Sequence, residues 1–112
     1  MGSTVKAQQA KAYKTIYYFA KTDNATFRLK YADGYPAGSE IQIYQAKKPT
    51  QYFLPESGET DQKGMFIFRS DTGAGITLAG ITEDMEMLKA IKANYFFKGK
   101  TQKLLFQKSK LR

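Results

Sequence analysis

The sequence predicts an all-β protein built as a small antiparallel β-sandwich. Short runs rich in aromatic and β-branched residues recur along the chain, and several alternate strictly between apolar and polar positions. Turn signals such as Asp33-Gly34 and the run from Asp61 to Gly64 separate these runs at intervals of roughly ten residues. A chain of 112 residues fits one domain and can bury a core without disulfides or metals.

The first half of the chain supplies four expected strands. Residues 13–19 combine aromatic with β-branched side chains, which suit a half-buried pleated surface. Residues 26–31 and 40–44 alternate strictly, so each strand buries one face and leaves the other in water. A loop rich in Pro, Ser and Gly follows, and a short strand at residues 51–54 interrupts it.

The second half predicts two more strands and a closing hairpin, and it leaves one segment open. Residues 65–69 and 76–81 are expected strands of the same sandwich. Segment 82–94 forms either a short helix, which local propensity favours, or a turn followed by a strand. A glycine-containing turn joins residues 95–97 to 104–106 in the hairpin. The side chains expected in the core are Phe27, Leu29, Ile41, Ile43, Phe66 and Phe68.

The domain division follows from these elements. We expect a flexible N-terminal segment over residues 1–11, a single sandwich domain over 12–106 and a basic tail over 107–112. The opening Met1-Gly2-Ser3 resembles a remnant of an expression vector, which leaves open whether a natural leader once preceded it. No apolar run approaches the ~20 residues of a transmembrane helix.

The composition argues against catalysis. The chain contains no His and no Cys, so it has no imidazole base, no Ser/His/Asp triad and no thiol chemistry. We therefore expect a protein that is not an enzyme and has no cofactor. The weak candidates for a cation site are the clustered acids Glu83, Asp84 and Glu86, whose simpler interpretation is a solvated turn or helix start.

The net charge of +8 is concentrated at the two ends of the chain. Residues 1–31 carry six Lys or Arg against Asp23 alone, and residues 96–112 carry six against no acid. If the first and last strands lie side by side, these cations form one face that binds polyanions weakly, and salt abolishes the binding. The predicted partner-binding residues are Lys98, Lys100, Lys103, Lys108, Lys110 and Arg112.

Two motifs resemble a known family. Residues 27–44 read strand, Asp-Gly-Tyr-Pro-Ala-Gly turn, strand, and residues 60–68 read Thr-Asp-Gln-Lys-Gly-Met-Phe-Ile-Phe. In this order they are similar to the signatures of carboxypeptidase-regulatory-like domains, whose fold is a transthyretin-like (prealbumin-like, Ig-like) sandwich. The nearest resemblance is to extracytoplasmic accessory proteins of bacterial nickel and cobalt uptake. Those proteins have a turn with glycine and histidine where this chain has residues 83–88.

The resemblance implies a binding or accessory module. We therefore expect a non-catalytic extracytoplasmic module, periplasmic or at the cell surface, whose partner is another protein or domain of the same assembly. The resemblance also links it to metal-ion uptake or to cell-surface interaction. The alternative is a small basic domain that binds single-stranded nucleic acid by stacking aromatic rings on bases. The aromatic residues near lysines are Tyr13, Tyr17, Tyr18, Tyr95, Phe96 and Phe97, and their simpler role is core packing.

Overall fold

The computed structural model describes residues 14–57, 60–61, 63–82 and 85–109. Its eight strands are β1 (Lys14–Lys21), β2 (Thr26–Asp33), β3 (Glu40–Tyr44), β4 (Gln51–Pro55), β5 (Phe66–Arg69), β6 (Gly75–Ala79), β7 (Ala90–Phe97) and β8 (Lys100–Lys108). Two single 3₁₀ turns, η1 (Pro36–Gly38) and η2 (Met85–Met87), precede β3 and β7. The strands expected at residues 26–31, 40–44, 65–69 and 76–81 are confirmed to within two residues at each end.

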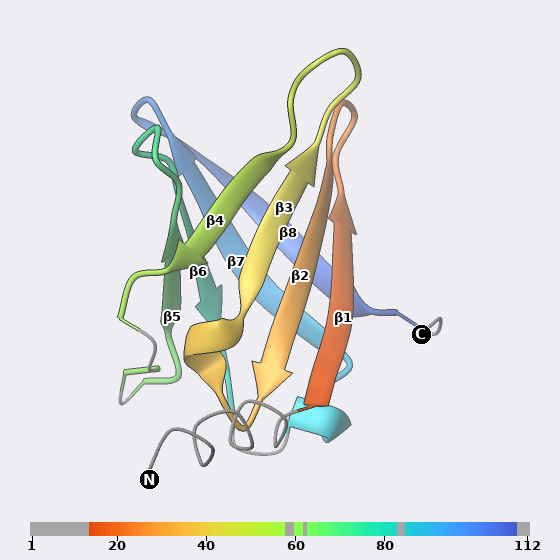
Figure 1. Ribbon diagram of the computed structural model, residues 1–112, viewed down its shortest axis with the longest axis vertical. Helices are drawn as coiled ribbons and strands as arrows, with labels where there is room; N and C mark the ends of the chain where they lie inside the picture. Colours follow the sequence, from red (N-terminus) through yellow and green to blue (C-terminus); the bar gives the residue numbers. More distant parts are fainter. Residues whose placement is uncertain (1–13, 58–59, 62, 83–84, 110–112) are drawn as a thin grey trace, which may run out of the picture.

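The strands close into an antiparallel barrel (Figure 1). Each strand pairs with its neighbour in the chain, and β8 returns to pair with β1. The predicted all-β class is therefore confirmed, whereas the predicted sandwich is wrong. The connections explain the difference, because consecutive antiparallel strands joined by short turns become neighbours, whereas a Greek-key sandwich needs connections that cross between its sheets.

Strand pairing is long within each half of the barrel and short where the halves meet. In Figure 1, β1–β4 lie in front and β5–β8 behind, and pairing runs the whole length of β1 against β2 and covers all of β7 against β8. We name the two meeting lines the β4–β5 seam and the β1–β8 seam. Their paired positions are Leu54↔Arg69 and Pro55↔Phe68 for the first, and Tyr18↔Lys108 and Phe19↔Gln107 for the second.

Large side chains fill the interior of the barrel. All six predicted core residues are buried, which confirms the inward face assigned to each strand from its alternation. Aromatic rings meet edge to face through the core, with centroids 6.5 Å apart for Phe27 and Phe106 and 4.8 Å apart for Phe66 and Phe68. An eight-stranded barrel is just wide enough for side chains to fill it, as they do here. The outer surface and the two ends are therefore the places to look for a binding site.

Segment 82–94 combines a turn with a strand. The single turn η2 leads into β7, which begins at Ala90 and pairs with β6 on one side and β8 on the other. Ladder bonds on both sides outweigh the local preference for helix, which is worth less than 1 kcal/mol per residue. The last strand, β8, continues through Lys108, whereas the sequence predicted that the domain ends at residue 106. Residues 1–11, expected to be flexible, lie outside the described residues.

Candidate binding face on the β1–β4 sheet

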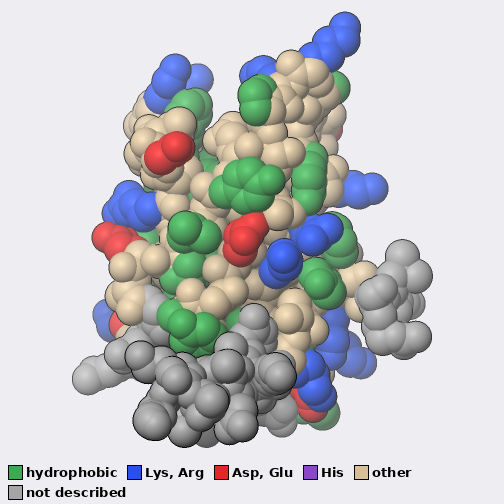
Figure 2. All heavy atoms as spheres, in the orientation of Figure 1, with side chains coloured by type: hydrophobic (Ala, Val, Ile, Leu, Met, Phe, Trp, Pro, Cys, Tyr) green, Lys and Arg blue, Asp and Glu red, His purple; other side chains and the backbone are tan. Residues whose placement is uncertain are grey.

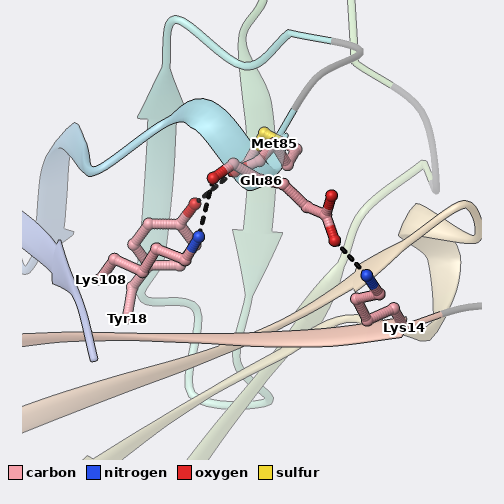
Figure 3. Close-up of polar contacts among 5 residues, drawn as sticks. All are labelled: Lys14, Tyr18, Met85, Glu86 and Lys108. Atoms are coloured by element: carbon pink, nitrogen blue, oxygen red, sulfur yellow. Dashed lines mark hydrogen bonds and ion pairs between the residues drawn. The ribbon is translucent and has the colours of Figure 1, made fainter. Parts of the chain in front are cut away.

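The turn η2 lies at the lower end of the barrel, where β1 begins and β8 ends, and we name it the η2 plug because its Met85 is fully buried in the core. Figure 3 shows the polar contacts that hold it. The hydroxyl of Tyr18, a fully buried residue of β1, donates to the carbonyls of Met85 at 3.1 Å and Leu88 at 2.7 Å. From β8, the Lys108 ammonium donates to the Glu86 carbonyl at 2.8 Å. The Glu86 carboxylate in turn reaches Lys14 of β1. Since both strands of the β1–β8 seam bond to η2, this network holds the plug in place.

The titration behaviour of these groups fits a structural role. Burial raises the pKa of the Tyr18 hydroxyl to about 12, with a smaller contribution from the negative charge of Asp33. The hydrogen-bonded ion pair between Lys14 and Glu86 raises the pKa of the ammonium and lowers that of the carboxylate. Each group is thus held in its usual ionisation state at neutral pH, which is the opposite of what general acid–base chemistry requires.

Of the acidic cluster named from the sequence, the structure describes one member, Glu86. Glu86 is engaged by Lys14, and Glu83 and Asp84 lie outside the described residues. Within the described ranges, no three Asp, Glu, His or Cys residues come together in a way that could hold a metal ion.

The predicted partner-binding cations are spread along the barrel. Lys98 and Lys100 lie at the upper end, Lys103 lies in the wall of β8, and Lys108 lies at the lower end. Because a strand rises about 3.4 Å per residue, the stretch of β8 from Lys100 to Lys108 spans about 27 Å. The first and last strands do pair, as the prediction of one basic face required. The pairing nevertheless leaves these four lysines at different heights along the barrel. Lys110 and Arg112 lie outside the described residues.

A surface combining rings and cations instead forms on the outside of the β1–β4 sheet. Inward positions along these strands are buried, so the alternate residues point outward. We name this surface the basic aromatic face, and its members are Tyr17, Phe19, Lys21, Arg28, Lys30, Gln42, Tyr44 and Tyr52. Figure 2 shows green hydrophobic side chains and blue Lys or Arg side chains intermingled on this side of the molecule.

The strand register arranges the face in rows that run across the sheet. One row consists, from β1 to β4, of Phe19, Arg28, Gln42 and Tyr52. Neighbouring strands lie about 4.8 Å apart, so this row spans about 14 Å. In the row below, Tyr17 lies opposite Lys30. Each row sets an aromatic ring beside a cation, and the second row ends at Glu40, which lies opposite Lys30. Single-stranded nucleic-acid binders combine such rings and cations to hold bases and phosphates.

Arg28 is the central cation of the face. Its guanidinium lies over the ring of Tyr17, with Cζ 5.3 Å from the ring centroid, which is cation–π geometry. Its Nε is buried and has no hydrogen-bond partner among the described residues. A buried donor without an acceptor costs free energy, so this Nε is a local departure from full hydrogen bonding. Arg28 as a whole is only partly buried, which leaves its charge available to a phosphate.

Charge is distributed unequally between the two ends of the barrel. Among the described residues, and leaving aside the Arg69–Glu56 ion pair, the upper end carries five cations against two acids, whereas the lower end carries four cations against four acids. The upper-end cations are Lys21, Lys47, Lys48, Lys98 and Lys100. Glu40, at the lower edge of the basic aromatic face, accepts a hydrogen bond from Gln42. The resulting field directs a polyanion to the face and to the upper end.

The opposite sheet lacks this pattern. Of the aromatic residues in β5–β8, only Phe96 occupies an outward position, where it is 42% exposed. The neighbouring strand β6 offers small outward side chains, namely those of Thr77 and Ala79. At the upper rim of this sheet, Phe97 is 38% exposed and has the Lys98 ammonium over its ring, but no row of rings and cations crosses the strands. The wall of this sheet therefore provides control positions.

The aromatic residues singled out from the sequence have several different locations. Tyr17 lies on the face, Tyr18 is buried, Phe96 lies on the other sheet, and Tyr95 packs half-buried against Phe27. The ring of Phe97 stacks on that of Tyr95, and Tyr13 lies outside the described residues. Sequence reasoning missed three ring-bearing members of the face, namely Phe19, Tyr44 and Tyr52. Tyr44 was accessible from the alternation of residues 40–44, whereas Tyr52 joins the face only through its pairing with Gln42.

Comparison with known proteins adds no relative. A scan against family models, a search of curated proteins and a search of solved structures each returned no match. Among the described residues, no helix has the length and apolar character needed to cross a membrane. The class of the molecule is thus defined by its own geometry, as a filled antiparallel barrel with one basic aromatic face.

Proposed function

We propose that the protein is a non-catalytic binding module whose basic aromatic face holds single-stranded nucleic acid. The register of β1–β4 carries the proposal, since it sets Phe19 beside Arg28 and Tyr17 beside Lys30 on one open surface. Aromatic rings offer stacking platforms for bases, and the neighbouring cations neutralise phosphates. Tyr44 and Tyr52 are the exposed rings of the face, whereas Tyr17 and Phe19 are half-buried.

The shape of the face favours single strands over duplexes. Bases of a duplex are stacked on each other, so their faces are closed to the rings of a protein, whereas unpaired bases can splay onto a sheet. An open four-stranded surface also has no helix or ribbon that would enter the major groove of a duplex. Since rings stack on every base, this face tolerates most sequences.

The test is a titration of fluorescein-labelled oligothymidylate, followed by anisotropy at several salt concentrations. Each phosphate contact contributes about 0.7 to the salt slope of single-strand binding, so Arg28→Gln with Lys30→Gln should lower the slope by about 1.4. Phe19→Ser should weaken binding by about 1–3 kcal/mol, the usual cost of losing one stacked base. The matched controls on the other sheet are Lys92→Gln with Lys103→Gln, and Phe96→Ser.

Two results would count against the proposal. One is no binding to the oligonucleotide even at low salt. The other is equal weakening by the face variants and by the controls, because that would reduce the interaction to the net charge of +8.

A second candidate function follows from the motifs that resemble carboxypeptidase-regulatory-like domains. Asp33-Gly34 and the Asp61–Gly64 turn, although far apart in sequence, line one depression of about 550 Å³ at the lower end. The Asp61 carboxylate accepts hydrogen bonds from the backbone N–H groups of Lys63 and Met65, so its first role is to hold its turn. A surface assembled from both motifs supports docking of a partner protein of the same assembly.

The resemblance behind this second candidate implies an extracytoplasmic location and a link to metal uptake or to the cell surface. Fractionation of the source cells separates the two candidates. Recovery in the periplasm or at the cell surface supports the accessory module, whereas recovery in the cytoplasm together with nucleic acid supports the first proposal.

A further inference from the structure

A groove opens beside the basic aromatic face where β4 and β5 diverge. Pairing at the β4–β5 seam ends at Leu54↔Arg69, where β5 itself ends, so the upper part of β4 has no paired strand on this side. The groove has a volume of about 500 Å³, and Figure 2 shows the upper end of the molecule hollowed between two projecting arms. Its wall on the β4 side contains Pro49, Thr50, Tyr52 and Leu54, and its wall on the β5 side contains Arg69, Asp71 and Thr72.

One wall of the groove is an open strand edge. Residues of a strand direct their backbone groups alternately to one neighbour and to the other. The Glu56 N–H bonds to the Ile67 carbonyl of the β5 side, and Leu54 is paired with Arg69. Tyr52, two residues further along, therefore directs its N–H and C=O to the same side, beyond the last paired position of the seam. The groove thus offers one backbone donor and one backbone acceptor to an incoming group.

We propose that this groove receives one unstacked nucleotide of the single strand bound to the basic aromatic face. The inference rests on the proposed function and adds to it a defined pocket for a base and its phosphate. Tyr52 connects the two sites, because its side chain ends a row of the face and its backbone lines the groove. A strand that follows the row from Phe19 to Tyr52 therefore arrives at the groove.

The chemistry of the lining matches a nucleotide. Tyr52 is 55% exposed and Leu54 is 57% exposed, so both offer apolar surface to the flat side of a base. Lys48 brings a cation to the rim for a phosphate group, and Arg69, whose Nε donates to the Glu56 carboxylate at 3.3 Å, adds the other N–H groups of its guanidinium. An apolar lining with a few convergent polar groups is the usual composition of a small-ligand site.

Asp71 gives the groove a preference among bases. Its carboxylate accepts hydrogen bonds only, so it favours the exocyclic amino group of cytosine or adenine and repels the carbonyl oxygen of thymine or uracil. Oligodeoxycytidylate should therefore bind more tightly than oligothymidylate, and Asp71→Asn should reduce this preference.

The experiment fills the groove from either wall. Thr72→Trp and Thr50→Trp should each lower affinity for oligodeoxycytidylate about tenfold, the loss of one well-held base, and should lower the salt slope by about 0.7, the contribution of its phosphate. The matched control is Thr101→Trp, which adds the same bulk to an exposed position of β8. A second measurement uses the unchanged protein, which should bind oligodeoxycytidylate more tightly than the same oligonucleotide with its bases removed and than a duplex of equal length.

The outcomes separate the two proposals. If the groove-filling variants bind like the wild type while Arg28→Gln with Lys30→Gln weakens binding, the groove inference is overturned and the proposed function stands. If none of these variants weakens binding, both are overturned. Equal affinity for the oligonucleotide with and without bases would overturn both proposals, because each rests on contacts to bases.

Discussion

Tyr18→Phe tests whether the η2 plug is held by the Tyr18 hydroxyl. The residue has no exposed surface, and its hydroxyl donates to two carbonyls, those of Met85 and Leu88. Removing the hydroxyl deletes these bonds and leaves buried acceptors without their donor, which costs about 1–3 kcal/mol. The ring keeps its packing, so no cavity contribution adds to this figure. We therefore expect the free energy of unfolding to fall by about 2 kcal/mol.

Urea unfolding followed by circular dichroism measures this change. The midpoint should fall while the dependence of the free energy on urea stays constant, because the surface exposed on unfolding is unchanged. Tyr95→Phe is the matched control, since the Tyr95 hydroxyl makes no hydrogen bond among the described residues. A loss below about 0.5 kcal/mol for Tyr18→Phe, or an equal loss in both variants, would refute the role given to the hydroxyl.

The same variant should change the response to alkaline pH. The pKa of Tyr18 is about 12 in the folded protein and about 10 in the unfolded chain, because burial disfavours the phenolate. Its contribution to stability is therefore complete below pH 10 and disappears as the pH rises through 12. Burial also raises the pKa values of Tyr31 and Tyr95, so the wild type should unfold steeply in this range. Tyr18→Phe should unfold less steeply, and an unchanged profile would contradict the assignment.

Three further predictions concern the core, a turn and metal binding. Phe66→Ala should lower the free energy of unfolding by about 3–5 kcal/mol, because the ring is fully buried against Tyr31 and Phe68; a loss under about 1.5 kcal/mol in urea unfolding would contradict this. Lys98→Asn should raise the free energy of unfolding by about 0.5–1 kcal/mol, because Lys98 has a φ of 52° in a two-residue hairpin turn that prefers Asn-Gly. The same change should weaken oligonucleotide binding, because it removes one of the cations at the upper end. Calorimetry at neutral pH should detect no tight site for Ni²⁺ or Co²⁺, since the chain has neither His nor Cys; a micromolar or tighter site would overturn this expectation.

Alternation predicted the strands well but could not predict how they close. The inward positions of β2, β3 and β5 follow from a period of two, so Phe27, Ile41 and Phe66 were correctly assigned to the core. Closure depends instead on pairing between Tyr18 and Lys108, residues at opposite ends of the chain. Nothing in the local pattern of either strand distinguishes this partner from another, because turns and alternation are common to barrels and sandwiches.

The candidate site shows the same division between local and long-range information. Six cations were grouped because they are close in sequence. In a strand, however, successive residues are about 3.4 Å apart and their side chains point alternately to opposite faces. The basic aromatic face is assembled across strands, where register places Arg28 between Phe19 and Gln42. One sequence does not reveal the register across the sheet. A surface of rings and cations could therefore be predicted, but not the residues that form it.

The departures from local structural rules gather at the surfaces assigned to binding. Among the described residues, the two non-glycine residues with positive φ are Lys47 and Lys98, and both lie in turns at the upper end. The buried donor without a partner belongs to Arg28, and the open strand edge belongs to Tyr52. Such departures cost stability and persist where function requires them. The filled core follows the rules throughout, so the barrel can tolerate these costs on one face and at one end. Changes there should accordingly alter binding more than folding, whereas changes at the η2 plug should do the reverse.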